Sequence, residues 1–390
     1  MKFNTYIMED ALEAIIDYRG KTPQKSESGI PTLSAKSVKN NFIDYNNCYY
    51  ISQEEYNRFM VRGFPKKGDI LLTTEAPLGM VAKLDRDDIA IAQRLLTLRG
   101  KNNILDNDYL LYFLQSSTGQ HLLKSHETGT TVTGIKQAVF RKLEISIPNI
   151  EDQRKIATIL SALDSRIELN TAINENLHQL IAAYYAEIFK ECEHTAKISD
   201  YADRVFSGGT PTTSNESYWS GEFKWLSSGE TSQKYIVDTE KTITQAGVDN
   251  SFTRLAKKYD TVIASAGQGH TRGQTSMLLT DTYINQSIIV VESERIYMPF
   301  IYWNICGRYE ELRVISNSNS IRGSLTTKMI SAFTAPKADI TQISRFSELA
   351  WAAIHEIEKN CNEIARLAAL RDTLLPKLMN GEIDVSEVKI

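Results

Sequence analysis

Several motifs could in principle carry chemistry, and each departs from the spacing that its chemistry needs. Gly20-Lys21-Thr22 ends like a phosphate-binding loop but lacks the upstream glycine of that loop. The glycines of residues 267–273 have the wrong spacing for a dinucleotide-binding loop. The six histidines form no clustered ligand set, so we expect no metal site, and His178 is expected to be an exposed helical residue. No Asp/Asn-Pro-Pro-Tyr motif of an adenine methyltransferase is present. These motifs therefore predict no catalytic site.

Composition and charge place the chain in an ordinary class. The sequence is 42% hydrophobic and 24% charged, which is typical of a globular protein with two or three domains at 390 residues. The longest apolar stretch, residues 180–186, is too short to span a membrane, and Glu9-Asp10 interrupt any signal-peptide core. Four widely spaced cysteines predict neither disulfides nor a zinc site. We expect a cytoplasmic protein without membrane contact, and a net charge of −4 gives no support for nucleic-acid binding.

The second half of the sequence repeats features of the first at an offset near 190 residues. Such a repeat indicates two similar domains, with chance similarity of two unrelated domains as the alternative. The corresponding segments occur in the same order: Gly20-Lys21-Thr22-Pro23 and Gly209-Thr210-Pro211, Pro31 to Ser34 and Lys224 to Ser227, Gly68 to Leu71 and Tyr259 to Val262, Ala92-Gln93 and Asn285-Gln286, and Ile147-Pro148 and Ala335-Pro336.

A long helical pattern follows each of the two prolines. Apolar residues recur at alternating spacings of four and three between Ile156 and Ile188, and again between Ala350 and Leu378, where Arg371 interrupts them. This is the 3.5-residue period of a coiled-coil seam. Asn170 and Asn360 fall in the two seams. If buried, they would penalise slipped registers; the alternative is that they lie at a solvated edge.

The predicted fold class is α/β (α+β), with two similar mixed α/β domains and two long antiparallel coiled-coil helices in an internal pseudo-two-fold repeat. A helix of some 40 residues is roughly 60 Å long, so it needs an equally long partner. The predicted boundaries are domain 1 at 1–148, helix 1 at 149–192, domain 2 at 193–338, and helix 2 with a tail at 339–390. This arrangement suits two separated half-sites on a DNA duplex, but it suits any bivalent adapter equally well.

Four segments resemble one known family. Residues 370–383, Leu-Arg-Asp-Thr-Leu-Leu-Pro-Lys-Leu-Met-Asn-Gly-Glu-Ile, are similar to the closing signature of type I restriction enzyme specificity subunits, the S subunit (HsdS) family. Pro148 to Leu160, with Gln153, resembles the start of that family's conserved helix. Phe206 to Pro211 resembles the opening of its target-recognition domains, and Thr73 to Gly79 resembles an interior loop. The resemblance covers essentially the whole chain.

The sequence also departs from this pattern at two places. The first opening reads Arg19-Gly20-Lys21-Thr22-Pro23, and the second helix begins with Thr341-Gln342-Ile343. Both places weaken the alignment with the family but leave the predicted architecture unchanged.

The resemblance implies a non-catalytic subunit that reads a bipartite, gapped double-stranded DNA sequence, one half-site per domain. It further implies two methyltransferase (M) subunits that use S-adenosylmethionine, and restriction/translocase (R) subunits that use ATP and Mg²⁺. No cofactor is expected on this chain. The alternatives are a bivalent protein-binding adapter without DNA specificity, and an enzyme with a degenerate active site, which the missing motifs disfavour.

Polar and basic residues in corresponding loops are the candidate DNA contacts. Lys and Arg mostly bind phosphates, whereas Gln, Thr and Ser can also reach base edges, and ordinary solvated loop residues are the alternative. The candidates are Arg19, Lys21, Thr22, Lys36, Thr74, Arg94, Thr133 and Lys136 in the first domain, and Thr210, Ser228, Gln268, Thr271, Arg272, Arg322, Ser324 and Lys328 in the second.

Overall fold

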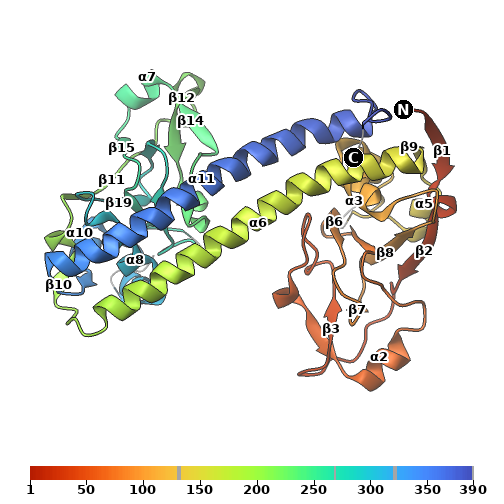
Figure 1. Cartoon of the computed structure of the whole chain (residues 1–390), viewed down its shortest axis with the longest axis horizontal. Helices are drawn as coiled ribbons and strands as arrows, with labels where there is room; N and C mark the ends of the chain where they lie inside the picture. The colour runs from red at the N-terminus through yellow and green to blue at the C-terminus, as the bar shows by residue number, and fades with distance from the viewer. Residues whose placement is uncertain (130–132, 268, 319–322, 389–390) are drawn as a thin grey trace. The chain divides into compact units, whose positions relative to one another are not determined.

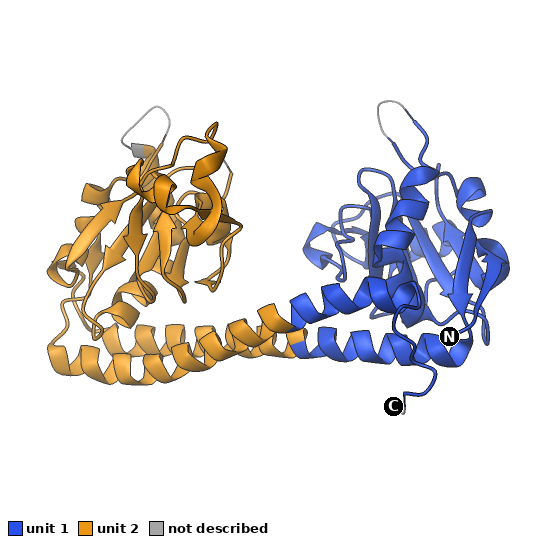
Figure 2. Ribbon diagram, turned by 90° about the horizontal axis from the view of Figure 1, so that it is seen from above, with its two compact units in different colours: residues 1–166, 367–390 blue, residues 167–366 orange. Residues whose placement is uncertain are grey.

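The computed structural model describes residues 1–129, 133–267, 269–318 and 323–388 (Figure 1). The chain divides into two compact units, coloured separately in Figure 2. Unit 1 comprises residues 1–166 and 367–390, and unit 2 comprises residues 167–366. Each unit is a mixed α/β structure, as the sequence predicts, and each is described by itself below.

Unit 1 contains a four-stranded antiparallel sheet in the order β2-β8-β5-β6, a three-stranded sheet β4-β3-β7, and the antiparallel pair β1-β9. The pairing of β3 with β7 is parallel. The strands are β1 (Phe3–Ile7), β2 (Leu12–Asp17), β3 (Ile30–Leu33), β4 (Tyr49–Ile51), β5 (Ile70–Thr74), β6 (Leu78–Lys83), β7 (Ala90–Ile91), β8 (Leu95–Gly100) and β9 (Glu144–Pro148).

Short helices cover these sheets. Asp106 caps α3 by accepting hydrogen bonds from the backbone amides of Asp108 and Tyr109, and residues 109–114 of this helix are all buried in the core. The unbroken apolar run leaves α3 no solvent-exposed face in that stretch, so its position against the sheet is set by packing. The short helices are α1 (Met8–Ala11), α2 (Gln53–Phe59), α3 (Asn107–Gln115), α4 (Ser117–Ser125) and α5 (Gln137–Arg141).

Unit 2 contains a five-stranded sheet β11-β19-β16-β17-β13, a four-stranded sheet β14-β12-β18-β15, and the pair β10-β20. The strands are β10 (Ala196–Lys197), β11 (Arg204–Ser207), β12 (Trp219–Leu226), β13 (Tyr235–Ile236), β14 (Lys241–Ile243), β15 (Arg254–Ala256), β16 (Thr261–Ala264), β17 (Thr275–Leu278), β18 (Thr282–Ile284), β19 (Ile288–Glu292) and β20 (Thr334–Ala335). The short helices are α7 (Gln245–Asp249), α8 (Met298–Cys306), α9 (Tyr309–Ser318) and α10 (Thr327–Ser331).

Many backbone contacts of unit 1 recur in unit 2 about 190 residues later. The parallel register Leu33↔Ile91 has the counterpart Leu226↔Ile284. We call β5 in unit 1 and β16 in unit 2 the central strands. Just before each of them, an aspartate carboxylate accepts a hydrogen bond from a lysine amide three residues earlier, at 2.8 Å in both cases. These aspartates, Asp69 and Asp260, form the same turn because the side chain satisfies an amide that would otherwise be unpaired.

The two aspartates differ in what faces them. The Asp69 carboxylate pairs with the Arg99 guanidinium through two hydrogen bonds of 2.7 and 2.8 Å. In unit 2 the position of Arg99 is taken by Glu292, as the matching strand registers show. Asp260 is 1% exposed, and its Oδ1 has no hydrogen-bond partner among the described residues. Burial, reinforced by the Glu292 charge, raises the pKa of Asp260 to about 7.

The two long helices are α6 (Ile150–Phe189) and α11 (Ile340–Met379), each 40 residues long. At the start of α6 the buried Gln153 accepts a hydrogen bond from the Asp106 amide and donates to the Ile104 and Pro148 carbonyls. This one side chain therefore satisfies three backbone groups at the junction of helix and sheet, which explains the Pro-to-Gln spacing in the sequence.

Polar residues in the helical seams are buried and hydrogen-bonded. In unit 2, Asn170 is 1% and Asn360 is 4% exposed, so neither lies at a solvated edge. They do not pair with each other: Asn170 Nδ2 donates to Glu363 Oε2 at 3.0 Å, and Asn360 Nδ2 donates to Asn174 Oδ1 at 2.9 Å. In unit 1, Arg371, which interrupts the apolar pattern, contacts Asp164 at 2.8 Å.

None of the helices in the described ranges is both long and apolar enough to cross a membrane.

The contrast between the two aspartates predicts opposite effects of the same substitution. Because the folded-state pKa of Asp260 lies above the unfolded value near 3.9, ionising it costs stability as the pH rises from about 4 through 7. Asp260→Asn keeps an acceptor for the Lys257 amide but cannot ionise. We expect it to raise the free energy of unfolding at pH 8 by on the order of 1–3 kcal/mol and to have little effect near pH 4.

Asp69→Asn is the matched control, and it should lower the unfolding free energy by about 1–3 kcal/mol because Arg99 loses its anionic partner. Urea denaturation of the two variants at pH 4 and pH 8 measures both effects. An Asp260→Asn variant no more stable than the wild type at pH 8 would contradict the interpretation.

Candidate nucleic-acid interface

The Arg19 side chain holds three loop segments of unit 1 together. Its guanidinium donates to the Thr74 hydroxyl at 3.0 Å and to the Ile135 carbonyl at 3.2 Å. The backbone amide of Ile135 donates in turn to the Thr74 carbonyl at 3.0 Å. The turn after β2, the end of β5 and the segment before α5 therefore form one frame, with the buried Thr74 at its centre.

The same backbone link joins the corresponding segments of unit 2. The amide of Leu325 donates to the Ser265 carbonyl at 2.9 Å, just beyond the end of β16. Here a different arginine supplies the side-chain bonds: Arg272 is 8% exposed and donates to the Gly323 carbonyl and to Asn317 Oδ1, both at 2.6 Å. Each unit thus anchors its loops at the end of the central strand with a buried or half-buried arginine.

In each unit a second hydrogen bond joins the glycine-proline loop to a turn before a strand. The loop is residues 20–23 in unit 1, where the turn precedes β8, and residues 209–211 in unit 2, where the turn precedes β19. In unit 1, Gln93 Nε2 donates to the Thr22 hydroxyl at 2.5 Å. In unit 2, the Thr210 hydroxyl donates to Gln286 Oε1. The direction of the bond is opposite, but the same pair of positions is joined. These glutamines were not among the predicted contacts, although their place in the repeat was the signal that could have identified them.

Arg94 adopts a backbone conformation that is unusual for a residue with a side chain. Its φ is 69°, in the left-handed region, and its carbonyl accepts a hydrogen bond from the Thr74 amide. The guanidinium is half exposed and lies 2.8 Å from Glu75. Glu75 partly offsets the Arg94 charge, so the local field is weaker than an isolated arginine would produce.

The predicted contact residues differ in accessibility. Thr74 and Arg272 are buried and bonded within the chain, so they position loops in this structure and do not offer free polar groups. Gln268 and Arg322 lie outside the described residues. The exposed candidates are Lys21, Thr22, Lys36, Arg94, Thr133, Lys136 and Lys328, and the partly exposed ones are Arg19, Thr210, Ser228, Thr271 and Ser324.

His178 is only partly exposed, contrary to the expectation of an exposed helical residue. Its ring stacks on Trp303, and its Nδ1 lies 2.9 Å from the Tyr235 hydroxyl. Burial, together with the nearby Lys234 charge, lowers the pKa of His178 to about 4. This histidine is therefore neutral at physiological pH and belongs to the aromatic core of unit 2.

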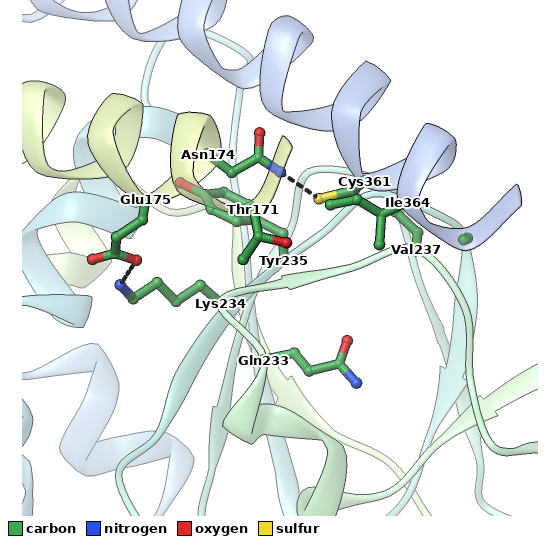
Figure 3. A pocket seen from close by; sticks show the side chains of 10 residues that line it. Thr171, Asn174, Glu175, Gln233, Lys234, Tyr235, Val237, Cys361 and Ile364 are labelled. Atoms are coloured by element: carbon green, nitrogen blue, oxygen red, sulfur yellow. Dashed lines mark hydrogen bonds and ion pairs between the residues drawn. The ribbon is translucent and has the colours of Figure 1, made fainter. Parts of the chain in front are cut away.

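One pocket of unit 2, of 470 Å³, lies among α6, α11 and the segment around β13 (Figure 3). Lys234 pairs with Glu175 at 2.6 Å, and this bond lowers the pKa of the glutamate. The Cys361 thiol accepts a hydrogen bond from Asn174, and burial raises its pKa to about 11. A thiol that stays protonated is a poor nucleophile, so Cys361 is not activated for nucleophilic chemistry.

Within the described part of the chain, no three His, Cys, Asp or Glu side chains form a group that could hold a metal ion. In both units a backbone hydrogen bond fixes a later loop at the end of the central strand.

Comparison with known proteins agrees with this arrangement. A family model described as the type I restriction modification DNA specificity domain matches residues 12–179. The type I restriction enzyme MjaIX specificity subunit of Methanocaldococcus jannaschii is 25% identical over 397 residues, covering 92% of this chain and 88% of that protein. The HindI specificity subunit of Haemophilus influenzae is 21% identical over 405 residues, covering 82% and 87%. The chain is thus similar to type I restriction enzyme specificity subunits over most of its length.

The fold agrees with that of a solved structure. The crystal structure of the type I restriction-modification S subunit from M. genitalium matches with a TM-score of 0.64 and 17% identity, covering 97% of this chain and 96% of that one. Specificity subunits are the non-catalytic components of their systems. The similarity of this chain to them supports a non-catalytic role.

The Arg19 frame leads to a prediction about local order. Arg19→Met removes the two side-chain bonds to Thr74 and Ile135, so residues 133–136 should open more readily. We expect hydrogen exchange at the Ile135 amide to accelerate about tenfold, which corresponds to a loss near 1.4 kcal/mol in local stability. The exposed neighbour provides the control, since Lys21→Met should leave that exchange rate unchanged. Equal rates in both variants would show that Arg19 does not order the segment.

Proposed function

We propose that this chain reads a bipartite, gapped double-stranded DNA sequence, with one half-site contacted by each unit. It would direct methyltransferase subunits, and nuclease/translocase subunits, to that sequence. The single observation that carries the proposal is the recurrence of one loop frame in both units. The end of the central strand and the glycine-proline loop are held by equivalent bonds about 190 residues apart.

The exposed and partly exposed loop residues named above are the proposed contacts. Lys and Arg would bind phosphates and make the affinity depend on salt, whereas Thr and Ser would reach base edges. Thr74 and Arg272 would act indirectly, by holding these loops. With a net charge of −4, the contact surface must rely on local groups, not on an overall basic character.

The two long helices would form the spacer between two target-recognition domains. Contacts within unit 2 support antiparallel packing: from Asn170 to Asn174 along α6, the partners on α11 run backwards from Glu363 to Asn360. The buried amides would favour one register, because a slipped pair leaves them unsatisfied. The predicted domain boundaries, at 148/149, 192/193 and 338/339, and the pseudo-two-fold repeat belong to this proposal.

The partner subunits would supply all the chemistry. Two methyltransferase subunits with S-adenosylmethionine would carry out adenine methylation, and restriction subunits with ATP and Mg²⁺ would carry out cleavage. The division of labour implied by the family resemblance supports this assignment, and so does the lack of an adenine methyltransferase motif in the sequence. A cytoplasmic location remains a prediction.

Sequencing of methylated DNA tests the proposal directly. The chain is expressed with its methyltransferase subunits in a host without other adenine methylation, and the modified genome is sequenced. We expect one two-part motif with an unspecified spacer. The same methylation pattern after deletion of this chain would overturn the proposal and favour a bivalent protein-binding adapter.

The spacer role makes a second prediction. One heptad inserted into both α6 and α11 adds about 10 Å of helix. At about 3.4 Å per base pair, the recognised spacer should lengthen by about three base pairs, or the complex should fail to assemble. The methylation motif reports the spacer and gel filtration reports assembly. An active complex with the original spacer would show that the helices do not set the distance.

A further inference from the structure

Two short segments at equivalent places combine exposed apolar side chains with basic residues. They are residues 61–67, Val-Arg-Gly-Phe-Pro-Lys-Lys, and residues 252–258, Phe-Thr-Arg-Leu-Ala-Lys-Lys. Each leads into the turn of the buried aspartate, Asp69 or Asp260, that precedes the central strand. Neither contains an acidic residue, in a chain whose net charge is −4.

Two apolar side chains of each segment are exposed to solvent. Phe252 is 90% exposed and Leu255 is 42% exposed, while Val61 is 65% and Phe64 is 55% exposed. Exposed apolar residues scattered singly over a surface need no explanation. Here, however, a pair of apolar residues, three residues apart, is exposed at matching positions of the two units. The recurrence indicates a shared use.

Each segment touches a loop that is a proposed DNA contact. In unit 1, the Arg62 guanidinium donates to the carbonyls of Asp17 and Arg19 at 3.0 and 3.2 Å. In unit 2, the Phe252 backbone lies against Gly209, where an added Cβ would come within 2.8 Å of the Phe252 carbonyl carbon. The apolar residue is therefore carried beside the Thr22 loop in one unit and beside the Thr210 loop in the other.

The charges around these side chains favour nucleic acid over protein as the ligand. Lys66, Lys67 and Arg254 are exposed, whereas Lys257 and Lys258 already contact Glu292 and Glu358. A specific protein interface buries about 800 Å² on each partner, far more than two side chains offer. Cationic side chains beside an exposed apolar side chain can bind phosphates while the apolar side chain inserts between stacked bases.

We propose that Phe252, and to a lesser extent Val61, is an apolar wedge that inserts beside a base step of its half-site. This inference rests on the proposed DNA-reading function. Inserting a side chain partly unstacks one step, and the cost depends on the sequence at that step. Flexible pyrimidine–purine steps would be favoured at the position of the wedge, so the residue would contribute to specificity without a hydrogen bond to any base.

The test uses the complex with its methyltransferase subunits and a duplex that carries the motif found by methylation sequencing. We expect Phe252→Ala to weaken binding about tenfold, the order expected when one base–aromatic contact is lost. Phe252→Trp should keep most of the affinity, and Val61→Ala should have a smaller effect because valine has less surface. Val314→Ala, which removes a side chain 69% exposed on α9, is the matched control and should bind as the wild type does.

Two further readouts separate a wedge from other roles. With 2-aminopurine placed at successive steps of the unit 2 half-site, the wild-type complex should increase fluorescence at one step, and Phe252→Ala should not. The salt dependence of the affinity should be unchanged by Phe252→Ala, because phenylalanine neutralises no phosphate and releases no counterion. The double variant Lys66→Ala and Lys67→Ala should show a weaker salt dependence.

The outcomes are distinguishable. Wild-type binding to the motif with an unchanged Phe252→Ala variant would overturn the wedge and leave the proposed function standing. A wild-type complex that prefers no sequence would overturn the proposed function itself. If Phe252→Ala instead loses methyltransferase subunits on gel filtration, the apolar segment is a protein contact and the wedge is wrong.

Discussion

The carbonyl at or just beyond the end of the central strand, on Thr74 in unit 1 and on Ser265 in unit 2, accepts a backbone hydrogen bond from a residue far along the chain. Together with the bonds made by Arg19 and Arg272, it fixes the loop before α5 or α10 relative to the sheet. The bond is buried, and an unpaired carbonyl there would cost desolvation energy, so the loop is held close to one position. The polar residues of each unit depend on this anchor for their placement.

The two units meet the same requirement with different side chains. Arg19 reaches across to Thr74 and Ile135 in unit 1, whereas in unit 2 Arg272 binds Gly323 and Asn317. The backbone frame is shared and its side chains have diverged. A protein that reads two different half-sites needs a common scaffold with independent surfaces, and this division of roles fits that need.

The two units also differ in the charged groups around the aspartate that precedes the central strand. Asp69 has an arginine partner, but Asp260 faces Glu292 and keeps one oxygen without a partner among the described residues. The turn itself survives in both units because the second carboxylate oxygen still accepts the lysine amide. The turn is therefore common to both units, whereas the Asp69–Arg99 ion pair has no counterpart at Asp260 among the described residues.

The sequence by itself determined the mixed α/β class, the family resemblance and the long helical patterns, because these depend on local periodicity and on residue order. It identified Asn170 and Asn360 as seam residues, but not that each bonds to another residue, Glu363 or Asn174. Only the tertiary structure decided which polar loop residues face solvent. Arg272 and Thr74 looked like contacts, yet they are buried, because exposure depends on segments that are distant in sequence. His178 was misjudged for the same reason: its neighbours Tyr235 and Trp303 come from other elements.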